Sequence, residues 1–307
     1  MLTSAMSQRP AVTKPAEISR GAFHQPDWSN QLPAAKTRRV NHEPRSRSSR
    51  SRFQTALHQM SVRTSVSFFN EYLPRSGDKV MTKWAHYFAV YEREFSRFRQ
   101  EPVSFMEIGI FKGGSIPMWK EFFHPESRLV FIDIDPECRA HALPGTHVHI
   151  GDQSDPAFLQ SMIEEHGPFD IILDDGSHIN RHQVSSFEAL WPAIREHGIY
   201  AVEDCHTSYW PGFGGGYRNE ASFMEFAKRT VDRMHSWYTD QDDLFQFDPI
   251  AAQLLGVRFY DSIVVFEKSP PKQAPVSLTV SNGQIQGTRA ALEMRGRKSI
   301  FSGRDGA

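Results

Sequence analysis

The sequence predicts an α/β protein with a mostly parallel sheet and helices on both faces. Short apolar runs typical of buried strands recur between residues 103 and 267, and segments with helical spacing of apolar residues separate them. Strands that alternate with helices form βαβ units, which place the strands in parallel. The last two runs, within 257–267, are too close together for a crossover helix and predict an antiparallel edge strand.

Each expected strand is a short apolar run that ends near glycine, proline or an acid. The expected strands cover residues 103–109, 128–135, 147–151, 169–175, 198–203 and 257–267. The expected helices lie within residues 79–98, 113–123, 157–166, 183–196 and 222–238. Open parallel sheets bind ligands at the carboxyl ends of their strands, so the polar residues after each strand are the candidates for function.

The charge distribution divides the chain into three parts. Residues 1–60 contain ten Lys and Arg against three Asp and Glu, a net charge of +7, whereas the whole chain carries -1. The run Pro44–Arg52 is rich in Arg and Ser and cannot form a core. We therefore expect a basic, disordered extension over 1–60, a folded domain over 61–270 and a weakly ordered tail over 271–307. Nucleic acid is an unlikely partner outside the basic extension, where an anionic surface is the alternative.

Composition also bears on the compartment. No apolar run approaches the roughly 20 residues that span a bilayer. The N-terminus lacks the basic start and apolar core of a secretory signal. The two cysteines, Cys138 and Cys205, provide neither a disulfide framework nor a zinc-ligand spacing. These features predict a cytoplasmic protein without membrane contact.

The first strand leads into a glycine turn and a helix start, Glu107-Ile-Gly-Ile-Phe-Lys-Gly-Gly-Ser115. Glycine lets a ligand approach the backbone closely, although tight packing alone is the alternative explanation. The spacing differs from the G-x-G-x-x-G turn that NAD prefers. The candidate cofactor-binding residues here are Glu107, Gly109, Gly113 and Ser115.

Acids follow the next two strands. Asp133 lies 24 residues after Gly109, where an acid accepts hydrogen bonds from a ribose diol. Asp152 and Gln153 follow the third strand and are candidates for an adenine edge. Two further acids, Asp135 and Asp155, are placed to cap the helices that come next. Three successive strand ends thus suit an adenosyl ligand, and the preference for acids over phosphate-binding groups favours the sulfonium cofactor S-adenosylmethionine.

A second group of acids follows strands four and five, in Leu173-Asp-Asp-Gly-Ser-His178 and Val202-Glu-Asp204. If these strands are neighbours, Asp175, Glu203 and Asp204 converge and repel one another unless a cation neutralises them. Hard oxygen ligands suit Mg²⁺, with Mn²⁺ and Ca²⁺ as alternatives. Each acid taken singly has a simpler explanation as a helix cap or a solvated loop residue.

His178, three residues after Asp175, is the candidate general base for a substrate hydroxyl. A divalent ion lowers the pKa of a bound oxygen, and a neighbouring base completes the proton removal. His206 is the competing base or a structural partner. The segment 209–216 mixes aromatic residues with glycine, which is typical of a substrate-covering loop, although an ordinary glycine-rich turn is the alternative.

These motifs, with Met106-Glu-Ile-Gly109, resemble the class I methyltransferases and, more narrowly, the macrolide-sugar O-methyltransferases of the mycinamicin and tylosin pathways. The resemblance spans residues 77–268. It implies a Rossmann-like fold, S-adenosylmethionine and Mg²⁺ as cofactors, and a place in natural product biosynthesis. Carried over to the matching motif positions, it implies metal ligands at Asp175, Glu203 and Asp204 and a base at His178. Asp174, in the same motif, is assigned to the cofactor.

We therefore expect an O-methyltransferase that acts on a hydroxyl of a sugar or glycosylated natural product. The resemblance also implies a homo-oligomer. Two alternatives remain open at this point. A catechol or phenol is a possible acceptor for the same machinery, and a degenerate methyltransferase fold with a basic tail would be a binding protein. Salt-sensitive nucleic-acid binding that is lost with residues 1–60 would favour the second alternative.

Overall fold

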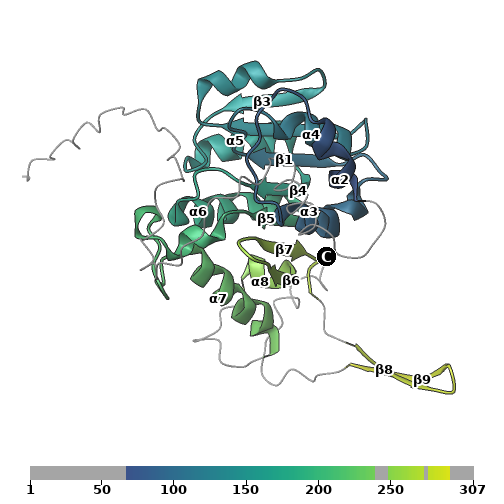
Figure 1. Cartoon of the computed structure of the whole chain (residues 1–307). Helices are drawn as coiled ribbons and strands as arrows, with labels where there is room; N and C mark the ends of the chain where they lie inside the picture. The colour runs from purple at the N-terminus through teal and green to yellow at the C-terminus, as the bar shows by residue number, and fades with distance from the viewer. Residues whose placement is uncertain (1–66, 239–247, 273–275, 291–307) are drawn as a thin grey trace, which may run out of the picture. The chain divides into compact units, whose positions relative to one another are not determined.

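A computed structural model describes residues 67–238, 248–272 and 276–290. Its main sheet has the strand order β3-β2-β1-β4-β5-β7-β6 (Figure 1). The strands are β1 Ser104–Ile108, β2 Arg128–Asp133, β3 Thr146–Ile150, β4 Phe169–Asp174, β5 Ile194–Val202, β6 Leu254–Phe259 and β7 Val264–Lys268. Strands β1 to β5 pair in parallel, whereas β7 pairs antiparallel with both β5 and β6. The predicted parallel sheet with an antiparallel edge is confirmed.

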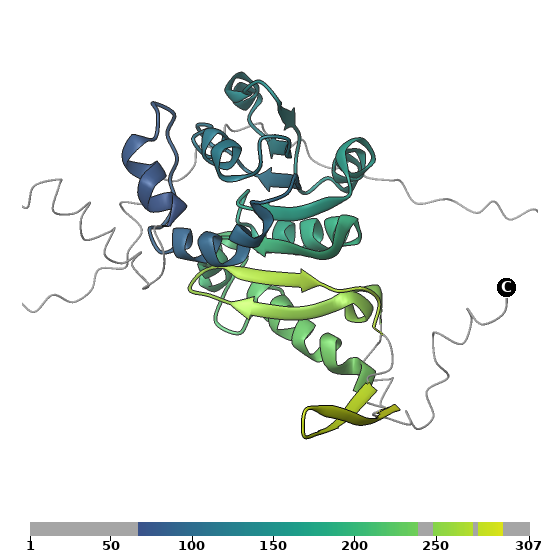
Figure 2. The ribbon, with the colours of Figure 1, turned by 90° about the vertical axis from the view of Figure 1, so that its right-hand side faces the viewer.

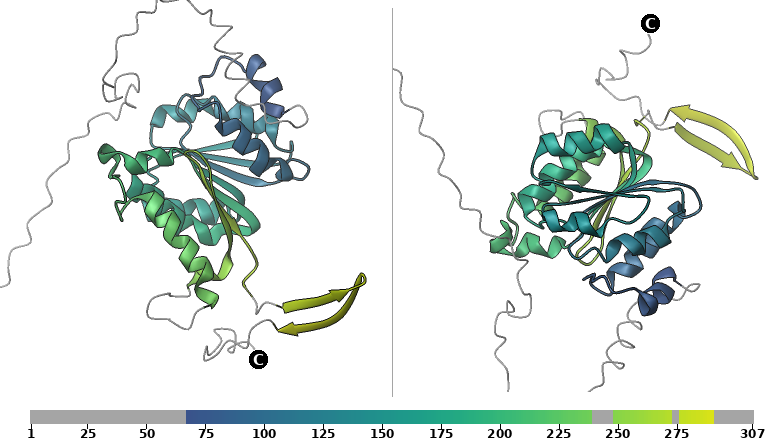
Figure 3. Two further views of the ribbon diagram at one scale, coloured as in Figure 1. Left: turned by 60° about the horizontal axis from the view of Figure 1, so that its bottom comes forward. Right: turned by 90° about the horizontal axis from the view of Figure 1, so that it is seen from above.

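Helices cover both faces of this sheet, as Figure 3 shows. One face carries α2 Phe68–Tyr72, α3 Tyr87–Phe95 and α4 Ser115–Phe122, and the other carries α5 Pro156–His166, α6 Asn180–Leu190 and α7 Phe223–His235. Successive side chains of a strand point to opposite faces. Accordingly, Ile171 and Leu173 of β4 join the core beneath α2–α4, while Ile172 joins the core beneath α5–α7. Figure 2 shows β6 and β7 side by side with α7.

Two of the expected helices have different bounds. Residues 79–86 are not helical, because Val80 uses its carbonyl to accept from Gly114 N at the start of α4. Helix α3 therefore begins at Tyr87. The helix expected over 183–196 was placed too late: α6 starts at Asn180, and a 3₁₀ turn at Trp191–Ala193 follows it. Pro192 in that turn cannot continue the ladder of an α-helix, so β5 starts at Ile194, four residues earlier than expected.

Several elements were not expected from the sequence. They are α2, α8 Pro249–Gln253, strands β8 Val276–Ser281 and β9 Gln284–Ala290, and short 3₁₀ helices at Leu73–Arg75, Cys205–Tyr209 and Pro211–Phe213. The expected helices within 79–98 and 222–238 end in 3₁₀ turns at Ser96–Phe98 and Ser236–Tyr238, and the helix that Asp135 caps is a 3₁₀ helix, Pro136–His141. Strands β8 and β9 form a hairpin around Asn282-Gly283, both with positive φ. Asn-Gly is the residue pair that a tight hairpin turn favours, so the sequence did contain the signal.

Some expectations fall outside the described residues. These include the disordered extension over 1–60 and the last part of the C-terminal tail, 291–307. Within the described ranges, no helix combines the length and the apolar composition required to cross a bilayer.

Candidate active site

The site lies at the carboxyl ends of three neighbouring strands, β1, β4 and β5. Glu107 is the fourth residue of β1, while Asp175 and Glu203 each follow the last residue of β4 and β5. The sheet order makes β4 the neighbour of both other strands, so the convergence expected from the sequence occurs. Glu107 and Glu203 are both fully buried.

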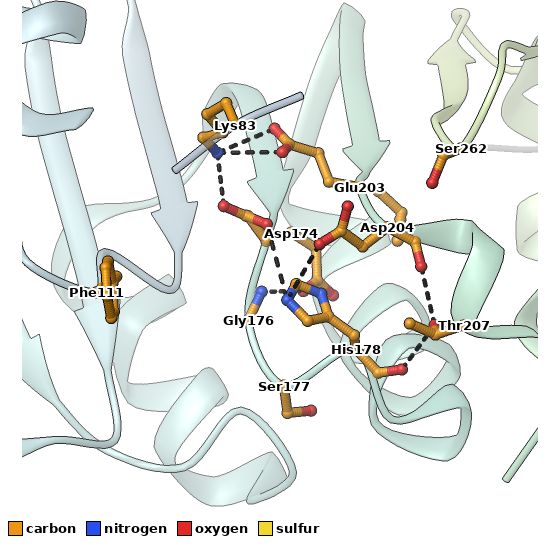
Figure 4. A network of polar contacts seen from close by, with 12 residues as sticks. Lys83, Phe111, Asp174, Gly176, Ser177, His178, Glu203, Asp204, Thr207 and Ser262 are labelled. Carbon is orange, nitrogen blue, oxygen red and sulfur yellow. Dashed lines mark hydrogen bonds and ion pairs between the residues drawn. The ribbon is translucent and has the colours of Figure 1, made fainter. Parts of the chain in front are cut away.

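A lysine that the sequence analysis did not single out lies at the centre of these acids. Lys83 Nζ is 2.6 Å from Asp175 Oδ2, 3.1 Å from Glu203 Oε2 and 3.4 Å from Glu107 Oε1. Its side chain is 3% exposed. Figure 4 shows the ammonium group directed at the Glu203 carboxylate. Lys83 therefore supplies one of the cations that a cluster of buried acids requires.

One ammonium does not neutralise the cluster. Burial acts against a charged Lys83, but the three carboxylates outweigh it and raise its pKa well above the ordinary value. Burial also raises the pKa of Glu107, Asp175 and Glu203, even though Lys83 acts in the opposite direction on each. Three carboxylates face a single ammonium, so their ionised forms are not fully compensated, and a further cation would favour them.

Two tyrosines of α3 donate hydrogen bonds to the carboxylates that follow β5. Tyr87 donates its hydroxyl to Asp204 Oδ1 at 2.5 Å, and Tyr91 donates to Glu203 Oε1. The two residues are four apart on the helix, so they share the face that packs on the sheet. Burial, followed by the adjacent carboxylates, raises the pKa of both phenols. They therefore remain hydrogen-bond donors at neutral pH.

His178 faces two of the acids. Its Nε2 lies 3.5 Å from Asp204 Oδ2 and 4.0 Å from Asp175 Oδ1. The residue has a φ of 56°, a left-handed conformation that is unusual outside glycine. Thr207 Oγ1 stabilises the local backbone by donating to the carbonyls of both His178 and Asp204 (Figure 4). The backbone thus directs this ring toward the acids.

His206 is placed differently. Its Nδ1 lies 2.6 Å from Ser262 Oγ, and its ring stacks on Trp84 with centroids 4.5 Å apart. The distance from Nδ1 to Asp204 Oδ1 is 3.9 Å. Burial lowers the pKa of His206. The hydrogen bond and the stacking favour the structural alternative considered for this residue.

The donor atoms left over fit a divalent ion. Asp175, His178 and Asp204 each offer one ligand atom, all within 4.8 Å of one another. Lys83 binds Oδ2 of Asp175 and Tyr87 binds Oδ1 of Asp204, so the other carboxylate oxygen of each residue is the one that would face an ion. Glu203, the third expected ligand, lies beside them with its oxygens engaged by Lys83 and Tyr91. The free carboxylate oxygens of Asp175 and Asp204 are hard donors, which suit Mg²⁺ or Mn²⁺.

The expected cofactor side begins at the glycine turn. Asp133 Oδ2 accepts from Ile110 N at 2.8 Å and from Phe111 N at 3.2 Å, so the acid of β2 binds the turn after β1. Ser115 Oγ donates to Glu107 Oε2 at 2.6 Å, which connects the first residue of α4 to the buried acid. Figure 4 places Phe111 apart from the group around Lys83. Five of the expected cofactor residues therefore form or adjoin one turn, namely Glu107, Gly109, Gly113, Ser115 and Asp133.

Packing requires the glycines of this turn. Gly109 has a φ of 86°, and a Cβ there would lie 2.2 Å from the Asp175 carbonyl oxygen. A Cβ on Gly113, whose φ is 73°, would meet the His141 ring at 2.5 Å. The close approach at both positions is to protein atoms, which is the packing explanation left open by the sequence.

Asp174 and Gln153 lie on the opposite face of the sheet from Glu107. Asp174 is fully buried and accepts from Gln153 Nε2 at 3.1 Å and from Tyr200 Oη at 3.2 Å. Gln153 also accepts from Ser177 N and donates to Ser186 Oγ. Burial raises the pKa of Asp174 to about 6. The two residues thus support the backbone of the His178 motif, and their cofactor role stays a prediction.

The other polar residues after β2 and β3 are at the surface. Asp152 is exposed and accepts from Ser154 N. Asp135 and Asp155 cap the helices that follow them, as expected, by accepting from Glu137 N and Ala157 N. Each of the three acids uses its Oδ1 in these bonds, and the adenine contact expected for Asp152 stays a prediction.

The aromatic loop is hydrogen-bonded throughout its length. Gly215 N donates to Trp210 O, and Gly216 N donates to Ser208 O. Asn180 at the start of α6 holds the segment: its amide nitrogen donates to Phe213 O at 2.9 Å, and its oxygen accepts from Phe223 N at 2.7 Å. The loop therefore has a defined backbone beside the acids, while its role in covering a substrate stays a prediction.

Sequence reasoning missed Lys83, Tyr87 and Tyr91 for different reasons. The two tyrosines were assigned to an apolar helix face, although a buried tyrosine hydroxyl usually requires a partner, and that was the available signal. Lys83 lies in a non-helical segment well before the first strand, and its sequence neighbours give no indication of burial.

Residues 106–205 match the family described as "Methyltransferase domain". These residues form a methyltransferase domain. The matched range includes Glu107, Asp133, Asp175, His178 and Asp204. Lys83 lies before it.

The chain is similar to curated O-methyltransferases. The chain is 37% identical over 203 residues to the 8-demethyl-8-(2-methoxy-alpha-L-rhamnosyl)-tetracenomycin-C 3'-O-methyltransferase of Streptomyces olivaceus, covering 61% of this chain and 50% of that protein. It is 34% identical over 188 residues to the mycinamicin VI 2''-O-methyltransferase of Micromonospora griseorubida, covering 58% and 47%. This chain spans about half the length of the curated relatives it matches.

A solved structure confirms the fold. The MycE methyltransferase from the mycinamycin biosynthetic pathway, in complex with Mg and SAH, matches with a TM-score of 0.57 and 32% identity. The match covers 63% of this chain and 54% of that chain. The expected Rossmann-like methyltransferase fold and the resemblance to macrolide-sugar O-methyltransferases are both confirmed.

Proposed function

We propose that this protein is an S-adenosylmethionine-dependent O-methyltransferase that acts on a sugar hydroxyl of a glycosylated natural product. The observation that carries the proposal is the position of His178, whose Nε2 faces Asp175 and Asp204 at the ends of adjacent strands of a methyltransferase domain. The similarity to sugar O-methyltransferases supports the acceptor class. A small-molecule hydroxyl compound is thus the proposed partner.

In this mechanism His178 is the general base. Its Nε2 would take the proton of the acceptor hydroxyl. When bound, S-adenosylmethionine would supply the methyl group to the acceptor oxygen, with its sulfonium sulfur leaving as a neutral thioether. Asp204 and Asp175, at 3.5 and 4.0 Å, stabilise the imidazolium that forms. The left-handed backbone of His178 fixes the direction of the ring, and correct alignment provides much of the rate.

Asp175 and Asp204, with Glu203 beside them, would hold the divalent ion. When bound, this ion would lower the pKa of the acceptor hydroxyl. Lys83 and Tyr91 fix the Glu203 carboxylate, and Tyr87 fixes that of Asp204, so these residues orient the acids before any ligand arrives. Mg²⁺ is the proposed metal because the available oxygens are hard donors.

The cofactor would bind across the turn after β1. Asp133 accepts a hydrogen bond from the backbone of this turn through one carboxylate oxygen. Two exposed apolar side chains are close to it along the chain path: Phe111 belongs to the turn, and Ile134 directly follows Asp133. An acid beside exposed apolar surface suits a ribose and its base. Glu107 lies behind the turn at the floor of the site.

The test separates cofactor, metal and base. S-adenosylmethionine binding is measured by calorimetry, and methyl transfer is then measured on a panel of glycosides and phenols with Mg²⁺ or with chelator. No cofactor binding would overturn the proposal, and chelator-insensitive turnover would remove the metal. Transfer to phenols alone would establish the catechol or phenol alternative.

The base is tested with a matched pair of variants. His178→Asn is the better substitution because asparagine tolerates a positive φ. We expect it to lower turnover roughly 10²- to 10⁴-fold with cofactor binding unchanged. His206→Asn should retain most of the activity. The opposite ranking would identify His206 as the base.

A further inference from the structure

A second cluster of side chains that could hold a metal ion lies at the β3 edge of the sheet, on elements that the candidate active site does not use. His149 belongs to β3, the outermost strand on that side, and Glu165 and His166 end helix α5. One ligand atom from each lies within 4.8 Å of the others. The proposed methyltransferase reaction assigns no role to any of the three.

The two imidazole rings face each other through their Nε2 atoms. His149 Nε2 and His166 Nε2 are 2.7 Å apart, and Glu165 Oε1 is 3.2 Å from His166 Nε2. Ligand atoms around a tetrahedral zinc ion, with bonds of about 2.0–2.1 Å, are separated by roughly 3.3 Å. Glu165 Oε1 is already at that separation from His166 Nε2. The two nitrogens would reach it after a small rotation of the partly buried His149 ring.

The surroundings favour a metal over protonated histidines. The Nε2 atoms of His149 and His166 are 2.7 Å apart and cannot both carry a proton, so at least one of them presents a lone pair to the cluster. His166 is 4% exposed, whereas the Glu165 side chain is 58% exposed and free to adjust. The C-terminal end of α5 also carries the negative end of the helix dipole, which attracts cations.

We propose that His149, Glu165 and His166 form a binding site for a transition-metal ion, zinc by its donor set, with solvent in the fourth position. Two imidazoles and one carboxylate are poor ligands for Mg²⁺, which prefers oxygen, so this site and the candidate active site select different metals. The ion joins edge strand β3 to the end of α5. Its role is structural. Without the ion, the two imidazoles share one proton, whereas the ion binds all three side chains and so links β3 to α5.

His147 provides an internal comparison. It lies two residues before His149 on the same strand, and its ring centroid is 4.9 Å from that of His166. Its nitrogens are not among the ligand atoms that converge. Glu164, next to Glu165, instead accepts from Gln160 Nε2 on the surface of the helix. Both neighbours therefore serve as matched controls.

The experiment measures zinc binding to the full chain after chelator treatment, by competition with a chromophoric chelator in excess Mg²⁺. Visible absorption of the Co²⁺ form reports the ligand geometry. We expect His149→Asn and Glu165→Gln each to weaken zinc binding by roughly 100-fold, because loss of a direct ligand should cost no less than loss of its outer-shell partners. His147→Asn and Glu164→Gln should bind as the unmodified protein does.

Thermal unfolding gives a second readout. Zinc should raise the melting temperature of the unmodified protein and of the two controls, and should leave that of His149→Asn unchanged. The same zinc affinity in the unmodified protein and His149→Asn would overturn the proposal. A loss caused by His147→Asn but not by Glu165→Gln would overturn the ligand set.

Discussion

Replacing Lys83 with methionine tests how the acidic site is neutralised. The substitution retains most of the length of the side chain and removes its charge from three carboxylates, two of which are fully buried. Removing one partner of a buried ion pair costs about 3–5 kcal/mol, because the other charge stays buried without compensation. We expect Lys83→Met to lower the free energy of unfolding by that amount in chelator.

The cost should depend on pH. Without Lys83, the pKa of Glu203 in the folded protein rises further above its value in the unfolded chain. The folded state then binds more protons than the unfolded state above the ordinary glutamate pKa, so stability falls as pH rises. The difference between variant and unmodified protein should therefore be larger at pH 8 than at pH 5.5. Urea unfolding followed by circular dichroism measures it.

Two controls separate charge from packing. Lys120 is exposed and donates only to the Pro144 carbonyl, so Lys120→Met should change stability by less than about 0.5 kcal/mol. Adding Glu203→Gln to Lys83→Met removes the uncompensated carboxylate, so the double variant should lose less than the sum of the single losses. Mg²⁺ should restore more stability to Lys83→Met than it adds to the unmodified protein. A Lys83→Met cost below about 1 kcal/mol, or additive losses in the double variant, would refute the reasoning.

Three further predictions address residues that support the site. Ionised Asp174 is disfavoured by burial, and its pKa of about 6 exceeds the model-peptide value by about two units, which corresponds to about 3 kcal/mol. The unmodified protein should lose that stability as pH rises from 4 to 7, and Asp174→Asn should lose less in urea titrations over this range. Gly109→Ala should destabilise the fold and abolish cofactor binding in calorimetry, because its Cβ would overlap the Asp175 carbonyl. Asn180→Ala leaves buried groups of the 205–223 segment without partners and should cost about 1–3 kcal/mol, with faster proteolysis of that segment.

Each of these three predictions has an outcome that would contradict it, and the Gly109 prediction also has a control variant. Gly212→Ala should be neutral, because a Cβ there meets no atom within 4 Å. Equal effects at Gly109 and Gly212 would contradict the packing argument. A pH profile of Asp174→Asn parallel to that of the unmodified protein would show that another group titrates. Protection of the 205–223 segment in Asn180→Ala would show that the backbone hydrogen bonds alone hold the loop.

Periodicity determined the fold class and most of the strands, because alternation of apolar strands and amphipathic helices is a local pattern. The strand-end motifs also identified Asp175, His178, Glu203 and Asp204 as one group, because parallel strands place their carboxyl ends at one edge of the sheet. The bounds of α6 and β5 were less accurate. Pro192 ended the helix earlier than the apolar pattern indicated, and only the packed strand decided where pairing began.

Only the tertiary structure determined which group is the partner of each buried charge in the site. The sequence contained the acids and showed that a cation was required, but it did not identify Lys83, which lies 92 residues from Asp175 and 120 from Glu203. The same holds for the approach of His149 to His166 across β3 and α5. Pairing of charges and ligands depends on distances in space, and a single sequence records only order and spacing along the chain. Local residue pattern therefore determined the elements and their chemically active ends, while the packing of distant segments determined which groups neutralise, orient or coordinate one another.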